Sequence, residues 1–380
     1  MSILKVDTIT KADGTGSLSV PAESGTVVTT ASPSLGRRNL IINGAMQVAQ
    51  RSTSLSVSSS GYRALDRFYW AANTEDVITM SQASDGPDEF ANSLKIEVTT
   101  AETDLAAGEY ALLTQRIEGQ NLQGIAKGTS SAKQLTASFW VKGSITGTYI
   151  VELFDNDNTR QVSASYTINS ANTWEYKTIT FPADTSGAFD NDNNGSLFVQ
   201  FVIASGTDFT SGTLNTSWAS STNANRWVGQ TNVIGTSGAT FYITGVQLEV
   251  GTVATPFEHR SYGEELALCQ RYYYKHGQGT GANTSEIGVG FYYNSTTAEV
   301  MVHFPVEMRA TPSYVGTSGT NYFVIFRNNA ADYVNSFSMP RGSTRCAGLE
   351  NSTEASGTAG HGALGRFNSA SAIVAFDAEL

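Results

Sequence analysis

The chain has 380 residues and carries 23 Lys and Arg against 34 Asp and Glu, a formal net charge of −11. This shortage of cationic side chains argues against nucleic-acid binding, because phosphates must be neutralised by positive charge. Only 15% of residues are charged and 36 are Gly, which also disfavours a helical enzyme rich in Ala, Leu, Glu and Lys. With 40% hydrophobic residues, the composition favours a loop-rich, all-β protein of two or three units.

We expect no membrane insertion. No apolar run approaches the roughly 20 residues of a membrane span, and the first residues, MSILKVDTITKADG, lack the apolar core of a signal peptide. Two cysteines, Cys269 and Cys346, are too few for a disulfide framework. Together these features predict assembly in a reducing cytoplasm.

Residues 1–36 are predicted to form an extended arm. Short alternating stretches such as LKVDTIT are separated by Gly, Ser and Thr, and the segment is too poor in apolar residues to bury a core alone. We expect the arm to be held by a partner through strand addition. The alternative is that it docks on its own subunit.

Residues 37–260 are predicted to form a β-sandwich, because many short alternating runs are separated by turn clusters. Leu135, Ala137, Phe139 and Val141 share one face of a strand, and so do the apolar residues of SLKIEVTT. The runs TYIVELF and SLFVQFVI are apolar on both faces and are expected to be central strands. The apolar phase slips at Gly245, which predicts a β-bulge there.

Residues 261–275 are predicted to form a connecting α-helix. Ser261 and Glu264 have the spacing of a capping box. An apolar stripe runs along the helix and includes Leu266, Cys269 and Tyr273. The stripe either packs on its own sandwich or forms an oligomer face with copies of itself, and both alternatives stay open.

Residues 276–380 are predicted to form a second, small β-sandwich. Its candidate strands include IGVGFYY, AEVMVHF, NYFVIF and SAIVAF, separated by wide polar loops. Small β units often gain stability by oligomerising, which favours self-association of this chain.

Several blocks of the sequence resemble one family. They are RNLIINGAMQVAQRS, GYRALDRFYW, QRIEG, ASFWVKG, NTWEYKTITFP and the long block ITGVQLEVGTVATPFEHRSYGEELALCQRYYYK. In this order they resemble a domain of phage tail fibre and minor virion proteins. The blocks HFPVEMRATPSY and IVAFDAEL resemble the tip domain that often follows, and MSILKVDTIT resembles the start of cyanophage and other marine-phage virion proteins. The resemblance implies a jelly roll similar to carbohydrate-binding modules in a receptor-binding, usually trimeric, fibre.

Exposed aromatic side chains are the first candidates for carbohydrate binding. Trp140 is out of phase with the apolar face of its strand, and Trp218 and Trp227 lie in or beside the polar run TSWASSTNANRWVGQ. Trp218 has the most polar neighbours. The alternative for each of these three tryptophans is packing in the core or at an edge. We assign Trp70 and Trp174 to such packing, because they match framework positions of the family that the sequence resembles.

Tyrosines in the last unit are a second set of candidates. Tyr292, Tyr293, Tyr322 and Tyr333 lie in or near loops rich in Asn, Ser and Gly, a composition typical of recognition surfaces. The alternative is that they pack at a subunit interface. Because the N-terminal arm is expected to be the attachment end, we place cell contact in this distal unit, where a trimer would add avidity.

The loop from Asp190 to Gly195 resembles the first half of a calcium loop, with Asp190, Asp192 and Asn194 as candidate ligands. The closing Glu is missing, since its position is occupied by Phe201, so an EF-hand is excluded. Asp155 and Asp157 offer a second such loop. The alternative for both is a polar turn shaped by Asn and Asp. No other cofactor is expected.

We predict no enzymatic activity, because the four histidines form no HExxH motif and no G-x-S-x-G elbow is present. The function indicated is a phage tail fibre protein that attaches to the tail or baseplate through residues 1–36 and recognises a host surface polysaccharide. A capsid fibre or head decoration protein and a polysaccharide-degrading tailspike are the alternatives. An anionic glycan would need a local basic patch, for which Arg341 and Arg345 are the candidates near the tip.

Overall fold

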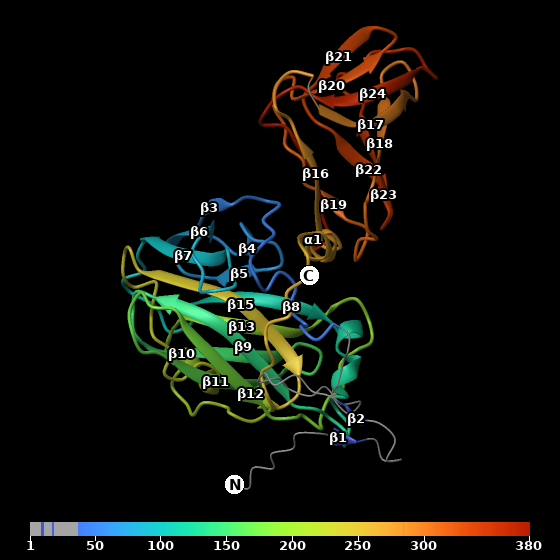
Figure 1. Cartoon of the computed structure of the whole chain (residues 1–380). Coiled ribbons are helices and arrows are strands. Elements are labelled where there is room, and N and C mark those ends of the chain that lie inside the picture. Colours follow the sequence, from blue (N-terminus) through green and yellow to red (C-terminus); the bar gives the residue numbers. More distant parts are fainter. Residues whose placement is uncertain (1–8, 11–16, 19–36, 284) are drawn as a thin grey trace. The chain divides into compact units, whose positions relative to one another are not determined.

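The computed structural model describes residues 9–10, 17–18, 37–283 and 285–380 (Figure 1). The chain divides into two compact units, Met1–Arg38 and Asn39–Leu380. In the first unit, β1 (Ile9–Thr10) pairs antiparallel with β2 (Ser17–Leu18). The rest of the predicted arm, residues 1–36, lies outside the described residues, so its attachment role stays a prediction.

The second unit begins with a sandwich of two antiparallel sheets. The seven-stranded sheet has the order β14 (Ala219–Ser220), β11 (Arg160–Ile168), β10 (Gly147–Asp155), β13 (Gly195–Ser205), β8 (Tyr110–Glu118), β5 (Tyr69–Ala72) and β4 (Gly61–Tyr62). The six-stranded sheet has the order β12 (Glu175–Phe181), β9 (Leu135–Gly143), β15 (Thr240–Val250), β7 (Ser93–Thr100), β6 (Val77–Ala83) and β3 (Ser54–Val57). Strands make up 43% and helices 6% of the structure, so the predicted all-β class and the sandwich are confirmed.

The core of the sandwich lies between these two sheets. The predicted inward face of β9 is buried, as are Leu94, Ile96 and Val98 of β7. Trp70 joins this core from the other sheet. Each large apolar side chain buried here stabilises the fold by about 1.5–3 kcal/mol. The strands β10 and β13 are central, as predicted from their apolar faces.

The outer faces of β8, β10 and β13 are partly covered by the segment 207–227. This segment carries two short 3-10 helices, η3 (Thr207–Phe209) and η4 (Asn223–Asn225), while η1 (Gly119–Asn121) and η2 (Gln123–Ile125) follow β8. Phe209 and Trp227 pack there on Leu112, Ile150 and Val202. A second, smaller core therefore lies outside the seven-stranded sheet.

The predicted bulge at Gly245 is present. The pairing of β15 with β9 shifts register between Thr244 and Gln247, and Gly245 has φ of 60°. A Cβ atom at Gly245 would lie 2.8 Å from Cζ of Phe90. Glycine is required here because the backbone is left-handed and the Phe90 ring packs directly on it.

The connecting helix α1 spans Tyr262–Gln270, and Ser261 caps it in the predicted capping box with Glu264. The predicted end at residue 275 is wrong, because β16 (Tyr273–Gln278) begins where the last helical turn was expected. Pairing of β16 with β25 (Ile373–Asp377) replaces helical hydrogen bonds, so tertiary contacts override the helical periodicity. Within the described residues, no helix is long and apolar enough to cross a bilayer.

The apolar stripe of α1 packs on its own chain. Cys269 is completely buried with Ile42 and Val48, and Leu266 lies against the same cluster. Tyr273 is buried as well, under the guanidinium of Arg51 at 3.7 Å. The predicted oligomer face of Leu266, Cys269 and Tyr273 is therefore wrong for the two buried side chains, because intrachain packing already covers them.

The C-terminal part contains two further antiparallel sheets around one core. One has the order β16, β25 and β19 (Ser313–Tyr314). The other has the order β21 (Ala330–Val334), β20 (Phe323–Arg327), β24 (Gly362–Phe367), β17 (Ser285–Tyr292), β18 (Ala298–His303), β23 (Cys346–Asn351) and β22 (Ser338–Gly342). Phe323, Phe367 and Phe376 meet in their shared core. A second small β-sandwich follows the helix, as predicted.

The last residues of the chain contact the first sandwich. Glu379 forms ion pairs with Arg67 and Arg51, and Asp377 with Arg51 at 3.0 Å. The carbonyl oxygen of Leu380 accepts hydrogen bonds from Tyr62 and Arg116. The C-terminal β-sandwich is thus joined to the first one both through α1 and through residues 377–380.

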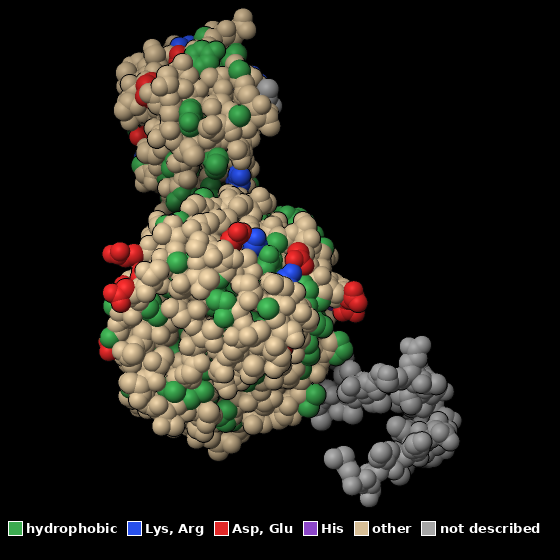
Figure 2. Space-filling model, turned by 90° about the vertical axis from the view of Figure 1, so that its left-hand side faces the viewer, with side chains coloured by type: hydrophobic (Ala, Val, Ile, Leu, Met, Phe, Trp, Pro, Cys, Tyr) green, Lys and Arg blue, Asp and Glu red, His purple; other side chains and the backbone are tan. Residues whose placement is uncertain are grey.

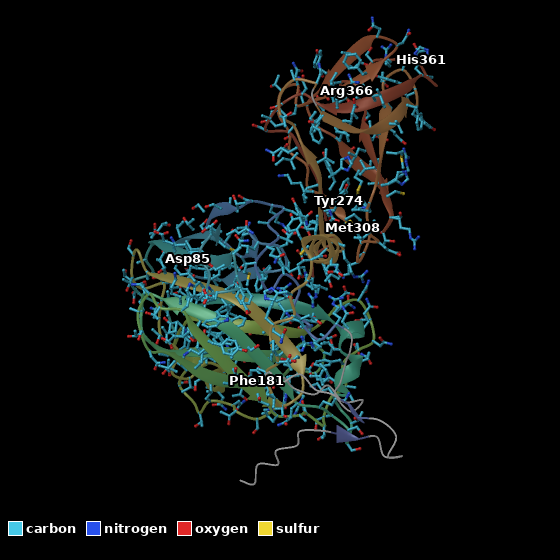
Figure 3. All side chains as sticks on the ribbon, in the orientation of Figure 1. Asp85, Phe181, Tyr274, Met308, His361 and Arg366 are labelled. Atoms are coloured by element: carbon cyan, nitrogen blue, oxygen red, sulfur yellow. The ribbon has the colours of Figure 1, made fainter. Side chains whose placement is uncertain are left out.

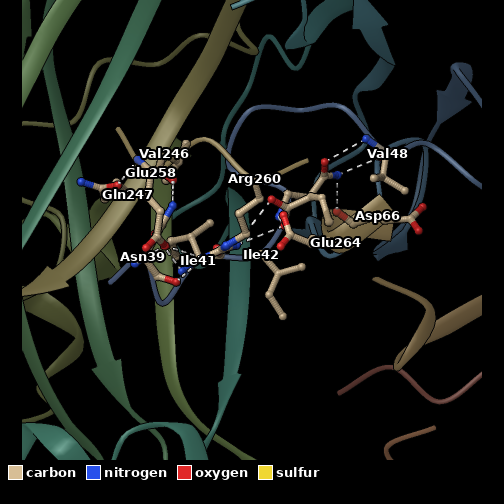
Figure 4. A network of polar contacts seen from close by, with 12 residues as sticks. Asn39, Ile41, Ile42, Val48, Asp66, Val246, Gln247, Glu258, Arg260 and Glu264 are labelled. Atoms are coloured by element: carbon tan, nitrogen blue, oxygen red, sulfur yellow. Dashed lines mark hydrogen bonds and ion pairs between the residues drawn. The ribbon is translucent and has the colours of Figure 1, made fainter. Parts of the chain in front are cut away.

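A buried polar network fixes the start of the first sandwich (Figure 4). The side chain of Asn39 donates to the carbonyl of Val246 at 3.0 Å and accepts from the amides of Ile41 and Leu248. Arg260 donates to the carbonyls of Asn39 and Ile41. These contacts tie residues 39–42 to β15 and to the segment that leads into α1.

We predict that Asn39→Ala lowers the free energy of unfolding by about 2–4 kcal/mol, because it leaves three buried backbone groups without partners. Urea unfolding followed by tryptophan fluorescence measures this loss. The control is Asn223→Ala, which changes an exposed residue and should stay within about 0.5 kcal/mol of the wild type. Equal stability of the two variants would show that the network contributes nothing.

Candidate functional site

An exposed aromatic pair stands on the outer face of the six-stranded sheet. Trp140 of β9 lies directly opposite Tyr176 of β12, and their ring centroids are 5.2 Å apart at 49°. The Tyr176 side chain is 46% exposed and Trp140 is half-buried. Trp140 points away from the core, as its phase in the strand predicted. We call Trp140 and Tyr176 the aromatic platform.

A hollow of about 180 Å³ adjoins the aromatic platform. Phe90 and Phe257 line it with an edge-to-face contact of 5.0 Å. Its polar lining includes the carboxylate of Glu89 and the hydroxyl of Ser138. Aromatic faces contact the C–H groups of a pyranose ring, and a carboxylate accepts hydrogen bonds from its hydroxyls. The arrangement therefore offers both kinds of contact that a sugar uses.

Glu89 is the most exposed polar group at this hollow. Its side chain is 76% exposed, and its Oε2 lies 4.0 Å from Nε2 of His259. The residue has φ of 75°, a left-handed conformation that is uncommon for a non-glycine side chain. Such conformations gather at ligand sites, where the surrounding structure maintains them.

A second aromatic pair extends the platform along the same sheet. Trp174 and Tyr242 meet edge to face at 6.1 Å, and Nζ of Lys142 lies 4.3 Å from the Tyr242 ring. Asp85, labelled at the edge of the sandwich in Figure 3, accepts from Trp174 Nε1 at 3.2 Å and from Lys142. Hydrogen bonding from Lys142 lowers the pKa of Asp85. Our assignment of Trp174 to the core is wrong, because its ring is half-exposed on this outer face.

The other two predicted tryptophans are held by intrachain contacts. Trp218 packs on the edge of the main core, and its Nε1 donates to the carbonyl of Pro182 at 2.9 Å. Trp227 is only 1% exposed, and its Nε1 donates to Glu152 at 3.1 Å. The buried Trp227 ring offers no free face on which a sugar can stack. The prediction that Trp227 binds carbohydrate is therefore wrong.

The four predicted tyrosines of the C-terminal sandwich separate into two groups. Tyr292 is completely buried, with its hydroxyl on Asp332, and Tyr322 packs on the core. Tyr293 and Tyr333 are 66% and 45% exposed. Tyr293 and Tyr333 thus present exposed rings and Tyr322 is half-buried, while burial contradicts a contact role for Tyr292.

In the loop proposed for calcium, the Asp192 carboxylate and the Asn193 side chain make hydrogen bonds within the protein. Both oxygens of Asp192 accept from Asn194, and Asp157 accepts from the amide of Asp190 at 2.9 Å. Asn193 donates to the carbonyl of Arg309 at 2.6 Å, which joins the loop to the C-terminal sandwich. The described part of the chain contains no group of three or more His, Cys, Asp or Glu placed to hold a metal. Calcium binding by this loop stays a prediction.

Oppositely charged neighbours pair with several charged side chains that the sequence suggested as site residues. Asp155, in the second proposed calcium loop, is buried in an ion pair with Lys127. Arg341 pairs with Glu299 and Glu350, and Arg345 pairs with Glu307. Figure 2 shows one face of the molecule on which charged side chains are sparse and acidic and basic groups stand next to each other. The predicted basic patch at the tip is therefore not a free cationic surface.

Comparison with known proteins gives matches in structure alone. No family model matches the chain, and no curated protein matches it. A structure of the enzymatically active domain of bacteriophage CBA120 tailspike protein 4 is similar at 16% identity and a TM-score of 0.30, over 56% of this chain. The match spans only 21% of the tailspike chain.

Two solved sugar-binding proteins are similar to the same extent. A putative sugar binding protein from Bacteroides thetaiotaomicron matches at 17% identity and a TM-score of 0.29, over 56% of this chain and 100% of its own. A family 11 carbohydrate-binding module from Clostridium thermocellum, solved with a mixed-linked tetrasaccharide, matches at 14% identity and a TM-score of 0.28, over 54% and 99%. TM-scores this low give no functional information about this chain.

Sequence reasoning found Trp140 but missed its partners. The alternation of TWEYKTITF places Trp174 and Tyr176 on one face of a strand, and this signal could have identified both. Glu89, Phe90 and Phe257 come from loops distant in sequence, where no periodicity marks them. The hollow is thus assembled by tertiary contacts.

We predict that Glu175→Gln destabilises the protein by about 1 kcal/mol at pH 7, a value reduced for solvent exposure. Burial opposes ionisation of Glu175, but hydrogen bonds from Lys177, Ser170 and Asn169 outweigh it and lower the pKa to about 2. Because the folded-state pKa is depressed, this stabilisation is complete above the unfolded value of about 4.3 and is lost as pH falls through 2. Urea unfolding of both proteins between pH 2 and 7 measures it. A difference that stays constant over this range would contradict the assignment.

Proposed function

We propose that the chain recognises a glycan on the aromatic platform and its hollow. The observation that carries this proposal is the exposed Trp140–Tyr176 pair beside the carboxylate of Glu89 and the hydroxyl of Ser138. The aromatic rings receive the apolar face of a sugar, and the polar groups orient its hydroxyls. Binding is reversible and involves no chemistry on the ligand.

We further propose that this glycan lies on the surface of a bacterial host and that the protein is a phage tail fibre protein. The sequence blocks that resemble tail fibre and minor virion proteins support this assignment. Residues 1–36 are then the segment that attaches to the tail or baseplate of the virion. The hollow of about 180 Å³ has the size of about one sugar unit. Several weak contacts made by one assembly therefore supply the strength of attachment.

The test of the platform is a glycan array probed with the wild type and with Tyr176→Ala and Trp140→Ala. We expect each variant to lose most of the binding signal, because the exposed rings provide the stacking surface. Tyr333→Ala is the matched control, since Tyr333 is 45% and Tyr176 46% exposed. Loss of binding in Tyr333→Ala with retention in Tyr176→Ala would overturn the platform and place recognition in the C-terminal sandwich.

A homotrimer is part of the proposal, and an exposed apolar patch on the C-terminal sandwich supports self-association. Val289 of β17 lies opposite Leu364 of β24, and Phe291 follows on the same face. Their side chains are exposed in the single chain. Contiguous apolar groups of this kind are typical of interfaces.

We expect light scattering to give three times the chain mass for the wild type and a smaller mass for Val289→Glu, because a carboxylate would be buried in the interface. Val253→Glu is the control, because Val253 is similarly exposed but lies after β15 of the first sandwich. A wild-type protein that is a stable monomer at micromolar concentration would rule out the trimer.

A further inference from the structure

The carboxylate of Glu89 gives the hollow beside the aromatic platform a charge of one sign. Among the described residues that line this hollow, Glu89 alone carries a charged side chain. The rest of the lining is aromatic or apolar, apart from the hydroxyl groups of Ser138 and Tyr176. A ligand that fills the hollow therefore meets a negative group beside aromatic rings.

Packing of the next residue, Phe90, holds Glu89 beside the hollow. The Phe90 amide donates to the carbonyl of Pro87 at 3.1 Å, which closes a turn with Glu89 in its third position. The Phe90 ring is buried, and it packs on Gly245 at the bulge and on the ring of Phe257. Glu89 therefore precedes an anchored residue, although its own side chain is exposed.

The turn has a glutamate where its backbone suits glycine. With φ of 75°, Glu89 occupies a turn position at which positive φ normally selects Gly or Asn. Glycine adopts this conformation without a steric penalty. The backbone alone does not call for a glutamate here, and replacing Glu89 by Gly does not strain the fold.

The ammonium groups on the strands of the aromatic platform are already paired. Lys142, on the outer face of β9, forms an ion pair with Asp85. Lys177 of β12 pairs with Glu175 at 2.6 Å. Neither cation is therefore available to neutralise Glu89 or to attract an anionic ligand to the hollow.

Glu89 itself has a weak partner. Within residues 37–283 and 285–380, its one ion-pair contact is with His259, whose Nε2 lies 4.0 Å away and is charged only when the imidazole is protonated. This distance is too long for a hydrogen bond. Asp88, the preceding residue, is exposed as well and adds a second carboxylate near the hollow. The exposed Glu89 carboxylate can thus accept a ligand.

The rings of the aromatic platform favour a ligand of the same charge. The faces of Trp and Tyr rings carry negative potential and attract cations. An ammonium group in the hollow would interact favourably both with these rings and with the Glu89 carboxylate. A sugar that carries a carboxylate would be repelled by Glu89.

We infer that the aromatic platform and its hollow bind an amino sugar, with the pyranose ring on Trp140 and Tyr176 and its protonated amine on the Glu89 carboxylate. This inference rests on the proposed function, because it uses the same site and adds the class of sugar. The preference is modest, since Glu89 is exposed and the ion pair is screened by water and salt. Repetition of the amino sugar along a polysaccharide multiplies it through avidity.

Saturation-transfer NMR titration with D-glucosamine, D-glucose and methylammonium at about pH 7 tests the class of sugar. The two sugars differ only at C2, and methylammonium is a cation without a ring. We expect the wild type to bind glucosamine about two- to fivefold more tightly than glucose, as an exposed ion pair allows. This preference should vanish in about 1 M salt, where the Debye length is about 3 Å. Equal affinity for the two sugars at low salt, or methylammonium that competes as well as glucosamine, would overturn the inference.

Two variants of Glu89 locate the charge. We expect Glu89→Gln and Glu89→Gly each to reduce the ratio of glucosamine to glucose affinity to about one. Glu97→Gln is the control, because it removes a carboxylate that pairs with Lys95 on β7 of the same sheet, and it should leave the ratio unchanged. Thermal unfolding checks that each variant folds, which Glu89→Gly should do because glycine suits its backbone. If folded Glu89→Gln keeps the wild-type ratio, the inference is wrong.

Tyr176→Ala separates this inference from the proposed function. It should weaken the binding of both sugars, because both stack on the same rings. Loss of both sugars in Tyr176→Ala, with an unchanged affinity ratio in Glu89→Gln, would overturn the amino-sugar inference and leave the platform standing. Wild-type binding of both sugars by Tyr176→Ala would overturn the platform and this inference with it.

Discussion

The arrangement of the second unit depends on the contacts of the Arg260 guanidinium. It donates to the carbonyls of Asn39 and Ile41 and pairs with Glu258 and Glu265. These partners belong to the first segment of the sandwich, to the segment after β15 and to α1. Because these side chains are largely shielded from water, each polar group needs its partner. Loss of one partner leaves the others without compensation for their desolvation. The network therefore fixes where the sandwich begins and where the helix leaves it.

This network also explains what the recognisable sequence blocks do. RNLIINGAMQVAQRS supplies Asn39 and Asn43, and the long block around ATPFEHRSYGEE supplies Arg260 and Glu265. The amide of Asn43 donates to Glu265 at 2.6 Å, so the two blocks meet although more than 200 positions separate them. These two blocks therefore hold the fold together, whereas the blocks ASFWVKG and NTWEYKTITFP carry Trp140 and Tyr176 of the aromatic platform.

The sequence predicted the features that depend on local periodicity. The alternation of β9 placed Phe139 inside and Trp140 outside, Gly245 marked the bulge, and Ser261 with Glu264 marked the helix start. Features that depend on distant partners were missed. The helix ends early because β25 pairs with β16, and Trp227 is buried because Glu152 takes its N–H. No pattern within a window of ten residues contains that information.

The same limit applies to the sites. Trp140 could be selected from its strand phase, but the hollow beside it needs Glu89 and Phe257 from two loops. The scarcity of Lys and Arg suggested that an anionic ligand would be met near the tip. The ion pairs of Arg341 with Glu350 and of Arg345 with Glu307 remove that surface. Charge counting cannot show which cations are neutralised.

The return of residues 377–380 to the first sandwich limits how this protein can be rearranged by recombination. A C-terminal module that hangs on one linker can be exchanged for another by a single crossover. Here a crossover in α1 would import a foreign tail opposite Arg51 and Arg67, and the two buried guanidinium groups would lose Asp377 and Glu379. An exchanged C-terminal sandwich therefore needs an acidic tail of its own that pairs with Arg51 and Arg67.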